Sequence, residues 1–465
     1  MELLLADLPL AILMALIGAL VFSLIGIVSG TDETATIAPL TLVVILLGVP
    51  PAGVWTFFFA AAVSKHMTHA IPTMLLGIPG DTMAVPLLDE ARQMRALGLP
   101  HVALRKAVSA AIISAFIAVP TAMVFSFVLS PFSELIGDLA PWLFLVAAFG
   151  IGYASAGKWA GVFAIIPFAA IVLGLNAWLG SFDTSVSTSY FLGIATGPML
   201  LDLLRAAVPL NRKEMARETP SRVYLAPVPE EQGEKKRSGW LPNPLRELDR
   251  TQKLATVSTS VVSSATFVFS PVAMTVLMGE LAGSRIKQGY QRLTTVLAAK
   301  NGTTESTYIA EAMIPLIAFG LPLSPVSAGP AAPLFNAPPV FHTDAESGQH
   351  YNISDALTSW EFFGLALIGV IAAALIAYPF SMRYAHTAAK FVVSKVSHEA
   401  IIAAFVGLVV AVSLWESGIL GLVVVLTVGL LSGLLIRVLR IHAGVLFMAY
   451  YVAILSVPGV MALLG

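Results

Sequence analysis

Long apolar runs separated by short polar stretches form the dominant pattern along the chain. The first run covers about 8–29, and most runs reach about 18 residues with few charges, the length needed to cross roughly 30 Å of hydrocarbon as a helix. Barrel strands would instead be short and would alternate between apolar and polar positions. The pattern therefore predicts an all-α polytopic membrane protein with about twelve membrane-embedded segments. Later runs of this kind lie near 107–131, 139–157, 159–180, 190–204, 358–380, 397–415, 416–436 and 443–464.

Composition strengthens the membrane prediction and excludes several classes of function. The 465 residues are 57% hydrophobic and 11% charged, with a mean hydropathy of +0.86, a balance far from that of soluble globular proteins. A net charge of -1 argues against binding to nucleic acid, and the absence of Cys excludes disulfides, thiolate metal sites and cysteine nucleophiles. The first run follows Glu2 and Asp7 rather than basic residues and is too long for a signal peptide, so we expect a first span.

Basic residues are distributed very unevenly, which predicts the orientation of the chain because Lys and Arg in short loops mark the cytoplasmic side. Four of them place 81–106 in the cytoplasm, whereas no Lys or Arg occurs between Lys300 and Arg383, so the loop in that gap should be extracytoplasmic. These assignments predict a multi-pass protein of the inner (plasma) membrane with an extracytoplasmic N-terminus. The four basic residues are Arg92, Arg95, Arg105 and Lys106, and the loop carries His342, Asp344, Glu346 and Asp355.

One sizeable polar segment, 208–253, divides the chain into two halves. It is rich in Pro, Glu and basic residues, a composition typical of a linker, and its basic residues predict a cytoplasmic location. We therefore expect a first membrane repeat at 1–207, a cytoplasmic polar linker at 208–253 and a second membrane repeat at 254–465.

Two stretches containing Pro and Gly interrupt apolar runs in corresponding positions of these halves. Pro72, Gly77 and Pro79 in PTMLLGIP recur at a constant offset of 243 in PLIAFGLP, which begins at Pro315. The first stretch leads into the basic loop and the second into the loop without Lys or Arg, so the two copies should point in opposite directions across the membrane. This predicts two inverted-topology repeats, each with a broken helix or re-entrant hairpin.

A broken helix inside the membrane exposes backbone groups that can bind a ligand. Pro removes an amide donor, Gly frees the backbone, and the unpaired groups are tolerated only where they face protein or a watery cavity. Paired interruptions in the two halves of a transporter point to a binding site near the membrane midplane. The alternative is a proline kink that only shapes helix packing.

The stretch at 71–98, IPTMLLGIPGDTMAVPLLDEARQMRALG, resembles the large permease subunit of the tripartite tricarboxylate transporters, the TctA family. Its LLGIPG matches that family's LLNIPG break, with Gly77 in place of Asn, and the stretch at 308–322 resembles the family's second break. Size, order and number of spans agree over nearly the whole chain. Three features depart from the family's pattern: Ser29 to Asp32 stand where it has PGLG, Leu323 replaces a Gly, and AAKNGTTESTYIAEA at 298–312 replaces APEAANNA.

The resemblance implies a secondary active transporter that imports a small organic anion, such as a tricarboxylate or dicarboxylate, with a sodium or proton gradient. It also implies an elevator-like movement, a small four-span membrane subunit and an extracytoplasmic solute-binding protein as partners, and no enzymatic activity. Because of the departures, the resemblance does not identify the substrate. The sequence does not determine the oligomeric state, for which a homodimer is one candidate. The alternatives are an uncoupled channel, a scaffold and, from another class of protein, an intramembrane hydrolase. A hydrolase would need a Gly-x-Ser-x-Gly elbow or a His-Glu-x-x-His pair, and the sequence has neither.

The predicted site consists of the two breaks and of polar residues near them in the two repeats. Carboxylates inside the membrane or at its edge are costly, so Asp32, Glu33, Asp81 and Glu311 are candidates for binding a coupling cation, with ordinary loop carboxylates as the alternative for the first three. No catalytic residue, resident metal or cofactor is expected beyond sodium or a proton. The predicted substrate- or ion-binding residues are Ser29, Gly30, Thr31, Asp32, Gly77, Ile78, Pro79, Gly80, Asp81, Thr82, Ser270, Asn301, Glu311, Gly320, Leu321, Pro322, Leu323 and Ser324.

Three polar residues before the first break, Lys65, His66 and His69, have two interpretations. They could attract an anionic substrate or bind a metal, but no matching set of metal ligands accompanies the two histidines in the sequence. The interpretation that we favour is a Lys that extends to the membrane surface beside incidental histidines. Glu305, in the second half, either assists Glu311 or belongs to a loop.

Four basic residues lie at 285–300. If the second repeat mirrors the first, this stretch must cross or re-enter the membrane, and four cations conflict with that position. They either line a path for carboxylates, because Arg binds carboxylates in bidentate geometry, or form a surface or subunit-contact segment. The four are Arg285, Lys287, Arg292 and Lys300.

Overall fold

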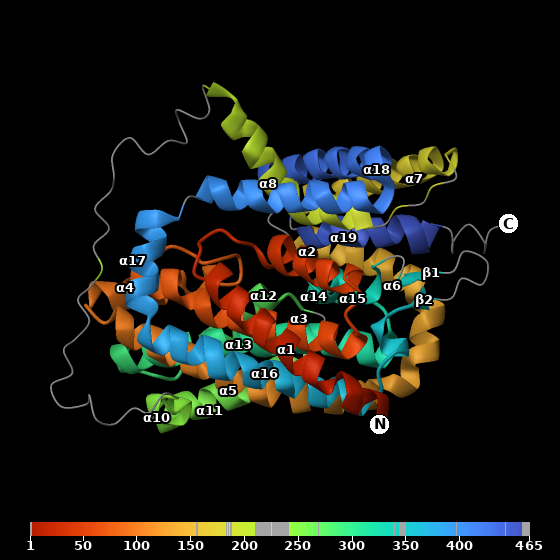
Figure 1. Cartoon of the computed structure of the whole chain (residues 1–465). Helices are drawn as coiled ribbons and strands as arrows, with labels where there is room; N and C mark the ends of the chain where they lie inside the picture. Colours follow the sequence, from red (N-terminus) through yellow and green to blue (C-terminus); the bar gives the residue numbers. More distant parts are fainter. Residues whose placement is uncertain are drawn as a thin grey trace.

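The computed structural model of the chain is almost entirely helical (Figure 1). It describes residues 2–154, 157–182, 184, 186, 188–209, 225, 241–267, 269–337, 340–343, 350–396, 398–441 and 443–457. Within these residues the only sheet is a two-stranded antiparallel hairpin in which His342 pairs with Tyr351. The prediction of an all-α protein is confirmed, apart from this short hairpin.

Short connections join most of the helices. The elements of the first half are α1 (Glu2–Ile25), α2 (Glu33–Leu46), α3 (Pro51–Thr68), the π-helical turn η1 (Pro72–Leu76), the 3₁₀ turn η2 (Val85–Leu87), α4 (Leu88–Ala96), α5 (Pro100–Leu129), η3 (Ser130–Phe132), α6 (Ser133–Ala154), α7 (Trp159–Gly180) and α8 (Thr188–Ala207). Those of the second half are α10 (Pro244–Glu247), α11 (Arg250–Ala265), α12 (Pro271–Gly283), α13 (Gly289–Phe319), α14 (Pro325–Ala328), α15 (Ala332–Phe335), β1 (His342–Thr343), β2 (His350–Tyr351), η4 (Ile353–Asp355), α16 (Ser359–Arg383), α17 (Ala385–Lys395), α18 (His398–Leu439), α19 (Ala443–Tyr451) and η5 (Val452–Ser456). A kink at Ser417 and Gly418, whose backbone angles are not helical, divides α18 into two helices.

Local sequence signals account for several helix starts. Asp32 caps α2 by accepting a hydrogen bond from Thr34 N, and α11 and α16 begin with capping boxes in which Asp249 and Thr358 are the capping residues. Pro occupies one of the first two positions of α3, α5 and α12, where its missing amide hydrogen costs nothing because that donor has no partner inside the helix.

The helices form two layers (Figure 1). In the first layer, α3 packs against α1 and α16, and α5 packs against α13, which also contacts α11 and α12. In the second layer, α8 packs along α18, while α6, α7 and α19 contact one another. The short helices α14 and α15 lie with α2 between the layers, because α14 contacts both α13 and α19, and α2 contacts both α3 and α8.

The outer surface suits a lipid environment. Large apolar side chains such as Leu13, Phe163 and Ile419 are exposed on long apolar helices, as expected where lipid rather than water covers them. Helix α13 has 31 residues and is about 46 Å long, so it is long enough to cross a membrane. It is not counted among the apolar spans, because Lys300, Glu305 and other polar residues lower its hydropathy. The total of about twelve embedded segments therefore stays a prediction. In the described residues, five helices are long and apolar enough to cross a membrane, at Asp7–Ile25, Pro100–Ile136, Trp159–Gly180, Ser359–Arg383 and Ser417–Leu439, and four further apolar helices are shorter.

Both predicted breaks end at a glycine in the left-handed backbone region. Gly77 has φ of 71° and Gly320 has φ of 64°, a conformation that Gly adopts without steric cost and that stops a helix. The two copies differ in detail. In the first, the π-helical turn η1 precedes the glycine, whereas in the second α13 continues through Pro315 to Phe319 as one helix.

Some predictions fall partly outside the described residues. Of the linker predicted at 208–253, the structure describes 208, 209, 225 and 241–253. Asp344 and Glu346 of the predicted extracytoplasmic loop also lie outside the described residues. The division into two repeats and the orientation in the membrane stay predictions.

Candidate functional site

The loop after α1 and the first break lie side by side. Residues 29–32 of the loop and 79–82 of the break, which both belong to the predicted site, are joined by backbone and side-chain hydrogen bonds. The contact holds the broken segment against the start of α2. The bonds run from Gly30 N to Gly80 O (2.7 Å), from Ser29 Oγ to Pro79 O and from Thr82 Oγ1 to Asp32 Oδ2 (3.1 Å), while Thr31 Oγ1 donates locally to Val28 O (2.8 Å).

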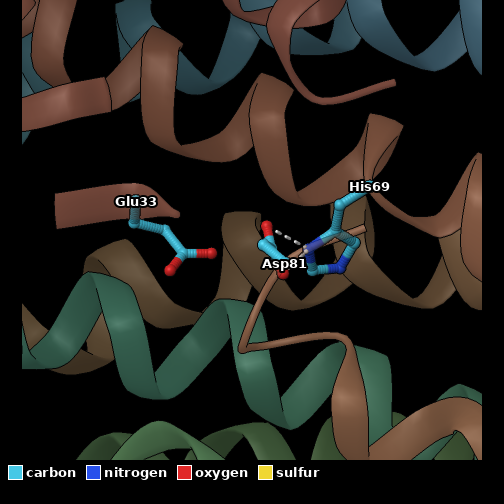
Figure 2. A group of neighbouring side chains, drawn as sticks. All are labelled: Glu33, His69 and Asp81. Carbon is cyan, nitrogen blue, oxygen red and sulfur yellow. Dashed lines mark hydrogen bonds and ion pairs between the residues drawn. The ribbon is translucent and has the colours of Figure 1, made fainter. Parts of the chain in front are cut away.

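Asp81 lies at the centre of a buried charged network next to this contact. Its carboxylate accepts hydrogen bonds from Lys65 Nζ and from His69 Nδ1, both at 2.8 Å, and from Ala84 N at 3.0 Å. Lys65 Nζ also lies 3.5 Å from Glu33 Oε1. The side chains of these four charged residues are at most 2% exposed. Figure 2 shows Asp81 between Glu33 and His69.

The interpretation that we favoured for Lys65, His66 and His69 is wrong. Lys65 does not extend to the membrane surface but is fully buried, and its ammonium group is paired with Asp81. The pairing with carboxylates offsets the cost of burying a charge, which is why the side chain is stable inside. One signal in the sequence could have indicated this. Positions 65, 66 and 69 share one side of an otherwise apolar helix, so their polar groups should meet a polar partner.

His69 faces an oxygen acceptor with each ring nitrogen. Its Nδ1 contacts Asp81, and its Nε2 lies 3.5 Å from Asn301 Oδ1. The amide orientation of Asn301 is set by its Nδ2, which donates to Ala107 O at 2.9 Å. His69 therefore connects Asp81 of the first break to Asn301 of α13, while Lys65 connects Asp81 to Glu33.

Ligand atoms of Glu33, His69 and Asp81 lie within 4.8 Å of one another, which is close enough to consider a metal ion (Figure 2). Lys65 argues against it, because its ammonium group already contacts both carboxylates. His69 Nδ1 is also occupied by its contact with Asp81. We therefore interpret the cluster as an ion-pair network and assign no metal to it.

Beside the network lies a buried pair without hydrogen bonds. Glu305 Oε2 lies 3.5 Å from His66 Nδ1, and His66 Nε2 lies 4.0 Å from Glu33 Oε1. Among the described residues, no hydrogen bond reaches either nitrogen of His66, either carboxylate oxygen of Glu305 or the hydroxyl of Tyr308, whose ring packs edge-on at 4.4 Å from that of His66. Glu305 therefore lies inside α13 and not in a loop. Groups buried in this way are costly, which makes them candidates for binding a proton or ion.

The second break has a carboxylate of its own. Glu311 Oε2 accepts a hydrogen bond from Val326 N at 3.0 Å, in the first turn of α14, while Ser324 Oγ donates to Glu311 O at 2.8 Å. Glu311 and Ser324 are both fully buried. Glu311 therefore holds the chain that follows the break against α13, and its Oε1 has no hydrogen bond among the described residues.

Contacts also link the second break to α2 and to the second layer. A Cβ atom added at Gly329, which follows α14, would lie 3.3 Å from Thr34 Oγ1 at the start of α2. Leu321 and Leu323 pack against the hydrophobic cluster of the second layer, which includes Phe447 of α19. The second break therefore lies between the two layers.

The remaining predicted residues are less closely joined to the site. Ile78 is 44% exposed, and Arg95 donates to Leu76 O beside Gly77, so the end of the first break is partly open and partly capped. Pro322 is buried, and Asn352 Nδ2 donates to Gly320 O at 2.9 Å. The half-buried Ser270 begins α12, and no contact given by the described residues joins it to either break.

The basic stretch at 285–300 separates into surface and interior residues. Arg285 and Lys287 are exposed in the turn before α13, and Arg292 forms an exposed ion pair with Glu280 at 3.9 Å. Lys300 is buried and donates to Glu90 and to Pro86 O, each at 2.8 Å. The surface interpretation therefore fits the first three residues, whereas Lys300 ties α13 to the segment that follows the first break.

Comparison with known proteins identifies the family. A family model described as the tripartite tricarboxylate transporter TctA family matches residues 12–448. Neither the curated proteins nor the solved structures that were searched contain a match. The match confirms the resemblance drawn from the two breaks, and the family is one of tricarboxylate transporters rather than enzymes, which sets the hydrolase alternative aside. The chain belongs to the tripartite tricarboxylate transporter TctA family.

Proposed function

We propose that the chain is the permease of a secondary active transporter that imports a tricarboxylate or a related small carboxylate with a sodium or proton gradient. Membership of the TctA family supports tricarboxylate transport. The observation that carries the proposal is the contact of the first break with a buried network of charged residues, which includes Asp81 of the break and reaches Thr82 through Glu33. Charged groups inside a membrane protein are costly and mark ion or substrate pathways.

The substrate site lies at the two breaks in this proposal. Gly30, Ile78 and Thr82 are exposed where the first break meets the loop after α1, and Leu321 and Leu323 are half-buried at the second. The end of each helix leaves backbone carbonyls and amides that can bind carboxylate oxygens or a cation. Specificity would then depend on backbone geometry as much as on charged side chains.

Two inverted repeats and an elevator-like movement complete the proposed mechanism. The order α1, α2, α3 and break is repeated as α11, α12, α13 and break, and the offset of 243 places Gly77 on Gly320, which share the left-handed conformation. In inverted-repeat transporters one unit moves against the other around the binding site. The two layers, with the second break between them, suit such a movement.

The partners are also inferred from the family. Membership of a tripartite transporter family supports a small four-span membrane subunit and an extracytoplasmic solute-binding protein as partners of the chain. The chain itself would cross the inner membrane several times. The orientation with an extracytoplasmic N-terminus rests on the distribution of basic residues. A homodimer is compatible with the sequence as the state of the permease.

The test is uptake of labelled citrate, compared with a panel of dicarboxylates and tricarboxylates, into proteoliposomes with imposed sodium or proton gradients. The wild-type protein should accumulate at least one of them, and Pro79→Ala and Glu311→Gln should lose most of that uptake while still folding. An uncoupled channel would equilibrate the substrate without accumulation. Absence of uptake by the wild-type protein, with its partner subunits added, would contradict the assigned substrate class.

A further inference from the structure

We propose that the ion that drives transport is a proton, and that it binds at Glu305 and His66 in the interior of the first layer. This inference rests on the proposed function as a carrier and names its coupling ion and binding site. It stands on three observations: a buried carboxylate without a hydrogen bond, a neighbouring network in which the buried Lys65 already contacts two other carboxylates, and a chain of contacts from Glu305 to the first break.

Glu305 is the acidic side chain with the fewest compensating contacts in the interior. It is fully buried on α13, both of its carboxylate oxygens lack hydrogen bonds, and His66 is the one basic group within 4.0 Å of it among the described residues. A bare carboxylate in such surroundings is strongly disfavoured. One proton, carried by the carboxylate or shared with His66 Nδ1, removes the uncompensated charge and supplies the missing hydrogen bond.

The charges around Glu305 offer it no other counter-ion. In the network next to it, Lys65 contacts Asp81 and Glu33, and His69 contacts Asp81, so neither side chain is paired with Glu305. Neighbouring α11 and α14 offer α13 mainly hydroxyl groups, such as Ser263 Oγ, which bonds Ser306 Oγ. Several charged groups on elements packed against α13 have partners elsewhere: Glu90 of α4 binds Lys300, Arg105 and Lys106 of α5 bind Glu247, and Glu280 of α12 pairs with Arg292. Others are exposed or half-buried rather than buried beside Glu305, namely Arg250 and Lys253 of α11, Asp89 and Arg92 of α4 and Glu134 of α6.

The same network disfavours a sodium ion between its own carboxylates. A sodium ion needs several oxygen ligands, and the nearest pair of carboxylates belongs to Glu33 and Asp81. Lys65 Nζ lies 3.5 Å from the first and 2.8 Å from the second, so a built-in ammonium group already occupies the position that a cation would take between them. A sodium ion there would have to displace a fully buried Lys, leaving its charge without a partner.

A continuous chain of contacts joins the proton site to the first break. Glu305 contacts His66, His66 Nε2 lies 4.0 Å from Glu33 Oε1, and Glu33 Oε2 lies 3.3 Å from Thr82 Oγ1, whose one hydrogen can be donated to Glu33 or to Asp32. Protonation converts a Glu305 carboxylate into a neutral acid, and release of that proton on the other side restores the charge. A change of charge at Glu305 therefore alters the field at His66 and at Glu33, and Glu33 contacts Thr82 of the segment that we assign to the substrate.

The experiment separates coupling from carrier activity. The permease, with its partner subunits, is reconstituted in sodium-free vesicles, and two quantities are measured with labelled citrate: exchange against internal unlabelled citrate, and accumulation driven by an inward proton gradient. Glu305→Gln imitates the protonated acid and should keep exchange within about twofold of the wild type but lose accumulation. Glu305→Asp keeps a titratable group and should retain accumulation, as should Glu280→Gln, which changes an exposed carboxylate in the same way.

Each result bears on a different claim. Accumulation by Glu305→Gln that equals that of the wild type overturns the proton site, and so does loss of exchange in this variant, because a pure coupling role leaves exchange intact. Wild-type accumulation that requires sodium and ignores the proton gradient overturns the choice of ion but leaves the carrier function standing. Absence of citrate exchange by the wild-type protein instead contradicts the proposed function itself.

Discussion

Lys65 is the cation on which two buried carboxylates depend. Replacing it with Met, Lys65→Met, keeps most of the side-chain volume but leaves Asp81 and Glu33 without their shared counter-ion. Removing one partner of a buried ion pair typically costs about 3–5 kcal/mol. We expect a loss of stability of this order, measured as a lower midpoint of thermal unfolding in detergent, together with loss of citrate transport.

An exposed ion pair provides the matched control for Lys65. Arg292 and Glu280 lie 3.9 Å apart with both side chains more than half exposed. Exposed pairs contribute at most about 1 kcal/mol, so Arg292→Met should leave the unfolding midpoint nearly unchanged. Equal effects of the two substitutions would show that the buried network has no special role in stability.

The glycines that end the two breaks are expected to be intolerant of substitution. Gly77→Ala and Gly320→Ala each force a residue with a Cβ atom into the left-handed region, at a cost of about 1–2 kcal/mol. At Gly77 the new Cβ would also lie 2.3 Å from Arg95 Nη1, which would have to move from its contact at the end of the break. Citrate uptake should fall in both variants, and more strongly in Gly77→Ala.

The control for these glycines is Gly174→Ala within α7. A Cβ atom there would meet no atom within 4 Å, and Gly174 has no left-handed backbone conformation. Because Ala favours a helix more than Gly does, stability should rise slightly or stay unchanged. Loss of transport in this variant to the level of Gly77→Ala would show that the conformation of the breaks is not the cause.

At the residue scale, the sequence predicts the breaks better than the charges around them. The repeat of Pro and Gly locates Gly77 and Gly320 correctly, because the backbone conformation of a glycine at a helix end is a local property. The partners of Lys65 and of Glu305 could not be predicted. Asp81 reaches Lys65 only through the turn after η1, and Glu305 meets His66 from the other half of the chain. Ser270, chosen from its place in the repeat, makes no described contact with the breaks.

At the scale of elements, the packing of α8 on α18 depends on small residues that the sequence analysis overlooked. Gly193 and Gly197 face Gly429 and Gly433, each pair with the spacing that lets membrane helices approach closely. A Cβ atom at Gly197 would lie 2.6 Å from Gly429 O. Gly197→Leu should therefore separate the helices and destabilise the protein by about 1–3 kcal/mol, measured by thermal unfolding.

Gly364→Leu is the control for this helix contact. Gly364 lies in α16, and a Cβ atom there would meet nothing within 4 Å. The variant should unfold at nearly the wild-type temperature. If Gly197→Leu is equally well tolerated, the close approach of α8 and α18 is not important for stability.

The long helix α13 shows why element prediction from hydropathy alone is incomplete. Its polar residues make a passage through the membrane unfavourable by sequence alone, yet every residue from Thr294 to Leu316 is buried. Protein rather than lipid surrounds these residues, and their polar groups bond α5, α11 and α12. Hydropathy reports the lipid-facing surface and therefore misses a helix that is enclosed by others.

At the scale of the whole molecule, the proposed elevator-like mechanism requires movement between the two layers. Ala35 of α2 and Leu200 of α8 belong to one buried cluster, so cysteines at these positions should be cross-linked by a short bifunctional reagent in a chain without native Cys. The cross-link should stop citrate uptake, and each single-cysteine variant should stay active. As the matched control, cysteines at Ala11 and Thr56, which contact each other within the first layer, should allow uptake after cross-linking. Full uptake with α2 fixed to α8 would contradict a movement between them.

Trans-stimulation of citrate transport by the wild-type protein in proteoliposomes distinguishes an alternating-access carrier from a channel. Vesicles loaded with unlabelled citrate should take up labelled citrate faster than empty vesicles, because a carrier whose site alternates between the two sides returns more quickly when it is occupied. Uptake that is equally fast into empty and loaded vesicles, and that equilibrates without accumulation under any imposed gradient, would contradict a carrier and favour a channel.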